Sequence, residues 1–176
     1  MNRALVPSEV RRQRLEAWVA EYSDAVLRTC YIYLADMAAA EDALQETFLK
    51  VWRSMDSFEG RNGSSAKTWI IRIAINTCKN YRSSAWFRRV DKSKIIEELP
   101  PSVTGVTDES RNVFFEVMQL PDKLKQVVLL YYYHGMNLAE TGEVLKISRA
   151  AVQKRLKKAY ELLRIQIEGS DSDEKR

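Results

Sequence analysis

Four carboxylates close together in the first third of the sequence are its first candidates for chemistry: Asp36, Glu41, Asp42 and Glu46. Clustered acids can hold a divalent metal ion for a nucleic-acid enzyme. Glu41 and Glu46 are five positions apart, so they share a helix face only in part, and neither a histidine nor a second acidic cluster accompanies them. We therefore expect a protein without catalytic residues, metal site or cofactor, and we interpret these acids as a docking surface.

The thiols and the imidazole of the chain do not form a metal-binding pattern. Cys30 and Cys78 each stand alone within a helical pattern, His134 is the single histidine, and no CxxC motif occurs. Isolated cysteines usually pack in a core, so we expect two buried, reduced thiols rather than zinc ligands. The N-terminal residues lack the apolar run of a signal sequence, and no stretch of about 18 uncharged apolar residues occurs. The sequence predicts a cytoplasmic protein that does not insert into a membrane.

A basic stretch with interleaved aromatic residues, KNYRSSAWFRRVDKSK, covers residues 79–94. It holds six basic side chains and one acidic side chain, with Tyr81, Trp86 and Phe87 among them. A single-stranded nucleic-acid site requires cations that pair with phosphates and rings on which unpaired bases stack. The alternative is that the rings close the hydrophobic core at the end of a helix, and we favour that alternative for Tyr81.

A second basic segment follows a short predicted helix near the C-terminus. Asn137, with Glu140 three positions later, forms a capping-box pattern that opens a helix to about Lys146. Ser148 can cap the last helix, which we expect to end near Ile167. A short helix, a tight turn and a longer basic helix are typical of a helix-turn-helix.

The predicted helix-turn-helix leaves one face of its last helix free for DNA. Gly142 lies where the two helices would cross, and Val144, Leu145, Val152 and Leu156 would pack between them. Early residues on the outer face would reach base edges and later ones phosphates. The alternative is a solvated surface helix, but the capped two-helix context favours DNA binding. The outward residues are Arg149, Gln153, Lys154, Lys157 and Lys158.

Helical periodicity dominates the rest of the sequence, and no alternating β pattern of useful length occurs. We expect helices over residues 12–34, 39–55 and 66–86, with a loop rich in glycine and serine between the last two. A further helix restarts at Pro121 and ends at Gly135. The predicted fold class is all-α.

Charge and composition divide the chain. Two basic blocks flank an acidic segment of little periodicity, which we interpret as a linker. The sequence thus predicts two small helical domains, at 1–90 and 112–168, joined by a flexible linker at 91–111 and followed by a disordered tail at 169–176.

Five segments together resemble those of extracytoplasmic-function (ECF) sigma factors, a subfamily of the sigma-70 family of RNA polymerase sigma factors: AEDALQETFLKVW, SFEG, KTWIIRIAINTCKNY, LPDKLKQVVLLYYYHGMNLAETGEVLKIS and VQKRLKKA. The resemblance implies two helical domains, region 2 and region 4. It implies an alternative sigma factor that is not an enzyme, binds core RNA polymerase and directs it to promoter DNA. It also implies control by an anti-sigma factor, which in this family is often membrane-anchored.

The resemblance assigns the helix of DALQETFLKVW to region 2.2, whose polar face docks on the clamp coiled coil of the largest polymerase subunit. Asp42, Gln45 and Glu46 would contact polymerase, with Leu49 at the edge of the contact. The apolar residues of the same helix would build the domain core: Leu44, Phe48, Val51 and Trp52.

The same resemblance places minus-10 promoter DNA on the loop and helix that follow. Residues 57–64 match region 2.3, which captures a base flipped out of the DNA, although a plain surface turn is the alternative. Residues 67–82 match region 2.4, in which we expect Trp69 to pack against the second helix. The residues that would approach the DNA are Phe58, Glu59, Arg61 and Asn62 of the loop and Asn76, Lys79, Asn80 and Arg82 of the helix.

Region 4 corresponds to residues 112–167, with its recognition helix starting at Ser148. For minus-35 DNA the resemblance implies Arg149, Ala150, Gln153, Lys154 and Arg155, while Lys157 and Lys158 would hold phosphates.

Four positions depart from the family pattern: Asn80 replaces a usual aspartate, Ile75 an arginine, Lys146 a glycine and Thr141 an apolar residue. A left-handed backbone at Lys146 would strain the turn. The alternative function is a helix-turn-helix transcription regulator that is not a polymerase subunit. Such a regulator would require neither DALQETFLKVW nor the basic aromatic helix.

Overall fold

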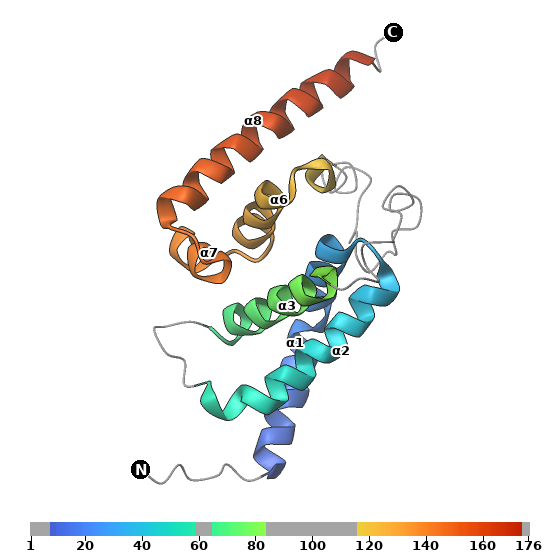
Figure 1. Ribbon diagram of the computed structural model, residues 1–176, viewed down its shortest axis with the longest axis vertical. Helices are drawn as coiled ribbons and strands as arrows, with labels where there is room; N and C mark the ends of the chain where they lie inside the picture. Colours follow the sequence, from blue (N-terminus) through green and yellow to red (C-terminus); the bar gives the residue numbers. More distant parts are fainter. Residues whose placement is uncertain (1–7, 59–64, 84–115, 174–176) are drawn as a thin grey trace. The chain divides into compact units, whose positions relative to one another are not determined.

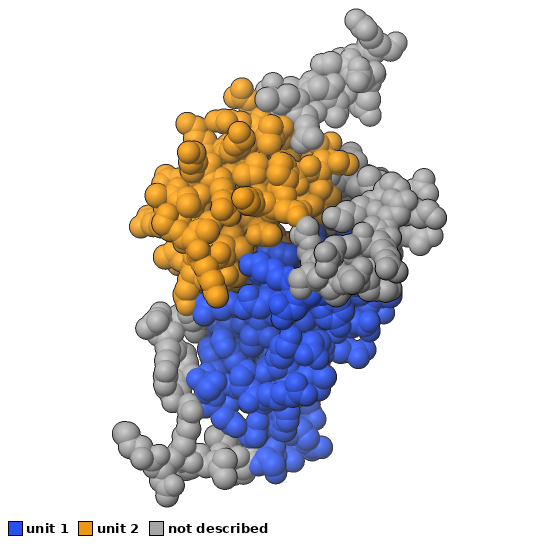
Figure 2. Space-filling view, viewed as in Figure 1, with its two compact units in different colours: residues 1–97 blue, residues 98–176 orange. Residues whose placement is uncertain are grey.

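The computed structural model describes the backbone of residues 8–58, 65–83 and 116–173 and the side chains of 8–58, 65–81 and 116–164. Every regular element in these ranges is helical, so the predicted all-α class is confirmed. The chain divides into two compact units, residues 1–97 and 98–176 (Figure 2). The predicted linker at 91–111, and the last three residues of the predicted third helix, 84–86, lie outside the described residues.

Three helices pack against one another in unit 1: α1 (Ser8–Leu34), α2 (Met37–Ser54) and α3 (Ala66–Ser83), with a 3-10 turn, η1 (Met55–Ser57), after α2 (Figure 1). α1 begins four residues before the predicted start. Its first turns carry ion pairs from Arg12 to Glu9 at 3.1 Å and to Glu16 at 3.8 Å. Such pairs stabilise the first turns of α1, whose residues form no apolar stripe. Hydrophobic periodicity therefore did not predict these turns.

A two-residue connection joins α1 to α2. Ala35 has a left-handed backbone, with φ of 57°, and its N–H donates to the Tyr31 carbonyl at 2.7 Å. Asp36 then caps α2, because its Oδ1 accepts from the Ala39 N–H at 2.7 Å. One of the four acids considered for metal binding is therefore engaged in capping a helix.

The core of unit 1 contains polar side chains whose hydrogen bonds are satisfied locally. The hydroxyls of Thr29, Thr47 and Thr77 each donate to the carbonyl four residues earlier, at 2.7, 2.6 and 2.9 Å. Cys30 and Cys78 are free and fully buried, as predicted. Completely buried apolar residues of the three helices and of η1 complete this core, including Val26, Leu34, Val51, Met55, Ile70, Ile71 and Ile75.

The described part of unit 2 starts with a helical segment at 116–119, followed by α6 (Asp122–Val128), a π-helical turn η5 (Leu129–Tyr133), α7 (Leu138–Leu145) and α8 (Arg149–Asp173). The predicted helix end at Gly135 is confirmed: its φ is 67°, and the Met136 N–H donates to the Leu130 carbonyl at 3.0 Å. The left-handed conformation favours glycine at this position.

α8 continues past the predicted end near Ile167, so residues 169–173 of the predicted disordered tail are helical. No proline interrupts this segment, and extending an existing helix costs little per residue. Gly169 alone, at a cost of about 1 kcal/mol, does not terminate it.

The second core joins α6 to α8. Leu120, Leu124, Val128 and Ala159 are buried together, and Leu156 packs against them with Val117, Leu162 and Leu163. Val144, Leu145 and Val152 are buried where α7 meets α8, as predicted. Leu156 therefore packs on the α6 side of α8, and its predicted place between the last two helices stays a prediction.

Candidate polymerase and nucleic-acid interfaces

The two faces of α2 separate polar from apolar residues. Asp42, Gln45 and Leu49 are exposed, and Leu49 is 50% accessible although it is apolar. Glu46 is half-buried, and its carboxylate pairs with Lys50 at 3.4 Å. Of the four residues expected in the core, Phe48 and Val51 are buried and Leu44 and Trp52 are half-buried. The polar row and the core stripe thus occupy different sides of one helix.

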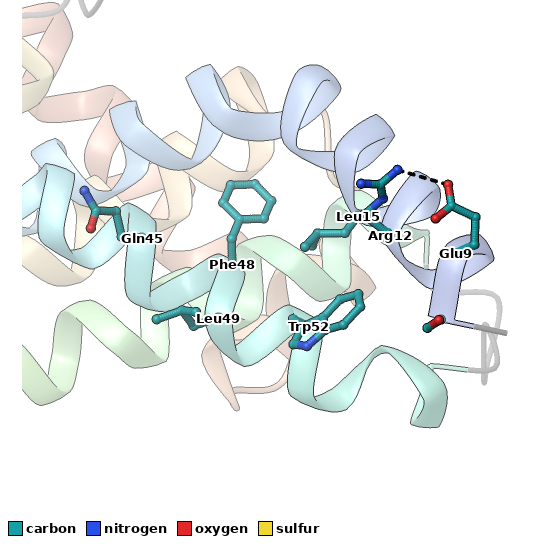
Figure 3. A pocket seen from close by; sticks show the side chains of 8 residues that line it. Glu9, Arg12, Leu15, Gln45, Phe48, Leu49 and Trp52 are labelled. Carbon is teal, nitrogen blue, oxygen red and sulfur yellow. Dashed lines mark hydrogen bonds and ion pairs between the residues drawn. The ribbon is translucent and has the colours of Figure 1, made fainter. Parts of the chain in front are cut away.

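An open, mainly apolar groove of about 770 Å³ lies between the start of α1 and this face of α2 (Figure 3). Leu15, Phe48 and Trp52 line it, with the Glu9–Arg12 ion pair at one end and Gln45 at the other (Figure 3). Sequence reasoning missed the α1 side of this groove, because the polar N-terminal turns of α1 carry no apolar period. The groove extends the exposed face of α2 onto α1.

An aromatic cluster connects the end of η1 to the start of α3. Phe58 and Trp69 are stacked with their ring centroids 4.7 Å apart, and Trp18 of α1 meets both edge-on at 5.8 and 5.9 Å. The ring contacts of Trp69 are thus with Trp18 of α1 and with Phe58, and its packing against the second helix stays a prediction. Phe58 is half-buried in this contact. Glu59, Arg61 and Asn62 lie outside the described residues.

α3 presents a polar face opposite its buried one. Asn76, Lys79 and Asn80 are exposed and lie within one turn, while Ile75 is fully buried. The departure at Ile75 thus lies inside the core and not on the surface. Arg82 belongs to α3, but its side chain lies outside the described residues.

Tyr81 connects α3 to the acidic face of α2. It is half-buried, and burial raises the pKa of its hydroxyl, to which the negative charges of Asp42 and Glu46 add. Its partial burial agrees with the interpretation that Tyr81 closes the core.

Local hydrogen bonds define the helix-turn-helix. The Asn137 Oδ1 accepts from the N–H groups of Ala139 and Glu140 at 2.9 and 3.0 Å, and the Glu140 carboxylate accepts from the Asn137 N–H at 2.8 Å. The predicted capping box is thus confirmed. Ser148 caps α8 as predicted, because its Oγ accepts from the Ala151 N–H at 3.1 Å.

The turn between α7 and α8 is strained and tightly packed. Lys146 has φ of 57° and ψ of 46°, which is the left-handed conformation that, from the family pattern, would strain the turn. Gly142 is fully enclosed: a Cβ there would lie 2.7 Å from the Ile147 carbonyl oxygen. The requirement for a small residue comes from the turn backbone and not from a side chain of α8.

The outer face of α8 is basic along its first three turns. Ser148, the residue before α8, is exposed, as are most of the predicted contact residues of the helix, and Arg155 is half-buried. The first turn contains no acid. Such a face can donate hydrogen bonds to base edges near the helix N-terminus and place cations near phosphates further along. The exposed contact residues of the helix are Arg149, Ala150, Gln153, Lys154, Lys157 and Lys158.

Two negative findings concern the described residues alone. No group of three histidine, cysteine, aspartate or glutamate side chains there is arranged to hold a metal ion. None of the described helices has the length and apolarity needed to cross a membrane.

Comparisons with known proteins agree with both halves of this arrangement. Residues 18–88 match the family model for Sigma-70 region 2, and residues 117–164 match Sigma-70 region 4. The ECF RNA polymerase sigma factor SigW of Bacillus subtilis is 30% identical over 160 residues, covering 83% of this chain and 84% of that protein. The ECF RNA polymerase sigma-E factor of Haemophilus influenzae is 28% identical over 166 residues, covering 85% of each.

Solved structures share the fold. The sigma factor RpoE in complex with the anti-sigma factor NepR from Bartonella quintana matches with a TM-score of 0.71 and 19% identity, covering 89% of this chain and 98% of that one. CnrH in complex with the cytosolic domain of CnrY matches with a TM-score of 0.66 and 20% identity, covering 90% of each. The region 2 match covers residues 18–88, in the N-terminal half of the chain. A transcription regulator that used only a helix-turn-helix would not need this half. The chain therefore belongs to the ECF sigma factors of the sigma-70 family and is an alternative sigma factor of RNA polymerase.

Proposed function

We propose that the exposed face of α2 is the surface that binds core RNA polymerase. The observation that carries this proposal is the exposure of Asp42, Gln45 and Leu49 on a helix whose opposite side is buried. An apolar residue that is half accessible beside acids and an amide fits a protein interface with an apolar centre and a polar rim. Glu46, held by Lys50, would complete the contact.

We further propose that α3 and the segment from Phe58 receive the separated minus-10 strand. Asn76, Lys79 and Asn80 offer two amides and a cation on one face, which suits base edges and phosphates together. The exposed part of the Phe58–Trp69 stack offers a ring surface for an unpaired base. Glu59, Arg61, Asn62 and Arg82 are assigned to the same surface from the family resemblance.

For the minus-35 element we propose that α8 enters the major groove. Arg149, Ala150, Gln153 and Lys154 would meet base edges, with Ser148 and Arg155 beside them, and Lys157 and Lys158 would bind phosphates. The segment at 91–111 would join the two DNA-binding units as a linker. All bond-forming chemistry would belong to the polymerase, so the chain itself would contribute no catalytic residue and no cofactor.

An anti-sigma factor is the proposed regulator. One of the similar solved structures is, by its own description, a sigma factor in complex with an anti-sigma factor. An exposed leucine beside an apolar groove on α2 is the type of surface that such a protein would need to cover. Because its proposed partners are polymerase, promoter DNA and an anti-sigma factor, we assign the protein to the cytoplasm.

Run-off transcription with core polymerase and a genomic fragment library tests the assignment. Start sites that depend on this protein and share two upstream motifs are expected. Asp42→Ala combined with Glu46→Ala should weaken core binding, with Asp24→Ala, an exposed acid of α1 outside the proposed surfaces, as the control. Lys154→Ala should reduce promoter binding and leave core binding intact, with Lys123→Ala as its control. Equal loss of both activities in either variant would contradict the division of roles.

A further inference from the structure

Arg11 makes three contacts across unit 1. Its Nη2 donates to the Trp52 carbonyl at 2.9 Å, and its guanidinium lies 4.4 Å from the centroid of the Trp52 ring. Its Nε is 3.1 Å from the Asp56 Oδ1, an ion pair without the alignment of a hydrogen bond. The planar guanidinium of arginine carries several N–H donors and can make all three contacts at once, whereas the single ammonium group of lysine cannot.

These contacts hold the point where the chain leaves α2. The Trp52 carbonyl is in the last turn of α2, where carbonyls lack partners within the helix, and a cation there also complements the helix dipole. Asp56 lies in η1, two residues before Phe58, and the Phe58 N–H donates to the Met55 carbonyl at 3.1 Å. The turn is therefore fixed by Arg11 at its start and by the Phe58–Trp69 stack at its end.

We infer that Arg11 is a positioning residue for promoter opening: it holds η1 so that Phe58 meets the separated minus-10 strand. This inference rests on the proposed role of Phe58. Arg11 acts through Trp52, which is half-buried, and Asp56, which is exposed, and not through the fully buried core. Its loss should therefore displace the turn while the three helices stay folded.

The variants Arg11→Gln, Arg11→Lys and Asp56→Asn test this inference in the assembled holoenzyme, with Arg53→Gln as the matched control. Arg53 is exposed in the same last turn of α2. The probes are core polymerase alone, a single-stranded oligonucleotide carrying the minus-10 motif mapped by run-off transcription, and the minus-35 duplex. Permanganate reactivity of the minus-10 thymines reports opening.

We expect Arg11→Gln to lose about 10-fold or more in binding of the minus-10 strand and in opening, because a displaced Phe58 ring loses the stacking of an unpaired base, which contributes about 1–3 kcal/mol. Core binding and minus-35 binding should stay within about 2-fold. Arg11→Lys, which keeps the charge opposite Asp56, should recover part of the loss. Arg11→Gln and Asp56→Asn together should lose less than the sum of their separate effects.

Two results would overturn the inference. The first is that Arg11→Gln binds the minus-10 strand and opens the promoter as well as the unmodified protein does. The second is that core binding falls as much as strand binding, because Arg11 would then only support the fold. If the unmodified holoenzyme itself does not prefer the minus-10 strand, the proposed role of the Phe58 surface fails first and the inference falls with it.

Discussion

Replacing Gly142 with alanine sets two physical effects against each other. In a helix interior, alanine is favoured over glycine by about 1 kcal/mol. The new Cβ, however, would lie 2.7 Å from the Ile147 carbonyl oxygen, which is backbone and cannot rotate away. Overpacking of this kind costs about 1–3 kcal/mol. Moving the turn outward would instead stretch the Ile147 N–H bond to the Gly142 carbonyl, now 2.9 Å, at about 1 kcal/mol.

The clash should win: subtracting the propensity gain of about 1 kcal/mol from the clash cost of about 1–3 kcal/mol leaves unit 2 of Gly142→Ala destabilised by up to about 2 kcal/mol. Amide hydrogen exchange in α7 and α8 measures this loss directly. All four tryptophans, Trp18, Trp52, Trp69 and Trp86, lie in residues 1–97, so tryptophan fluorescence during urea unfolding follows unit 1 as an internal control. Equal or slower exchange in the variant would refute the reasoning, because helix propensity would then outweigh the contact.

Three further predictions use the same measurements. Lys146→Gly should stabilise unit 2 by about 1 kcal/mol, because a lysine in the left-handed conformation costs about 1–2 kcal/mol and the extra backbone entropy of glycine costs about half of that. Lys146→Ala keeps the Cβ and should give no gain in stability. A gain in that variant would contradict the explanation. Thr141→Val should stabilise unit 2 by about 1 kcal/mol, because its buried hydroxyl has no hydrogen-bond partner among the described residues; a loss in exchange protection would refute this. The pKa of Cys30 is raised by its hydrogen bond with the Cys78 thiol and then by burial, so the folded state keeps a proton that the unfolded thiol releases above its ordinary value of 9.0. The contribution of Cys30 to the stability of unit 1 should be constant below that pH and fall by about 1.4 kcal/mol per pH unit above it, and a slope unchanged in Cys30→Ala would contradict the assignment.

The features that could be predicted from the sequence are those whose cause is local. The Asn137 capping box, the Ser148 cap and the end at Gly135 depend on residues within one turn of each other. The stacking of Phe58 on Trp69 could not be predicted in this way, because it arises from where the helices place two distant side chains. The same holds for Arg11, whose hydrogen-bond partner lies 41 residues away in the sequence.

The two proposed functional faces of unit 1 are joined by a short polar bridge. The Lys50 Nζ contacts the Glu46 carboxylate at 3.4 Å and donates to the Thr77 Oγ1 at 3.1 Å, while the Thr77 hydroxyl donates to the Ile73 carbonyl. Thr77 adjoins Asn76, so a residue of the proposed polymerase face is linked to the proposed DNA face through one lysine. Because α2 and α3 also share a close-packed core, they move as one body. Under the proposed function, polymerase bound at α2 therefore fixes the orientation of α3 by rigid geometry, and no conformational change is needed to connect the two sites.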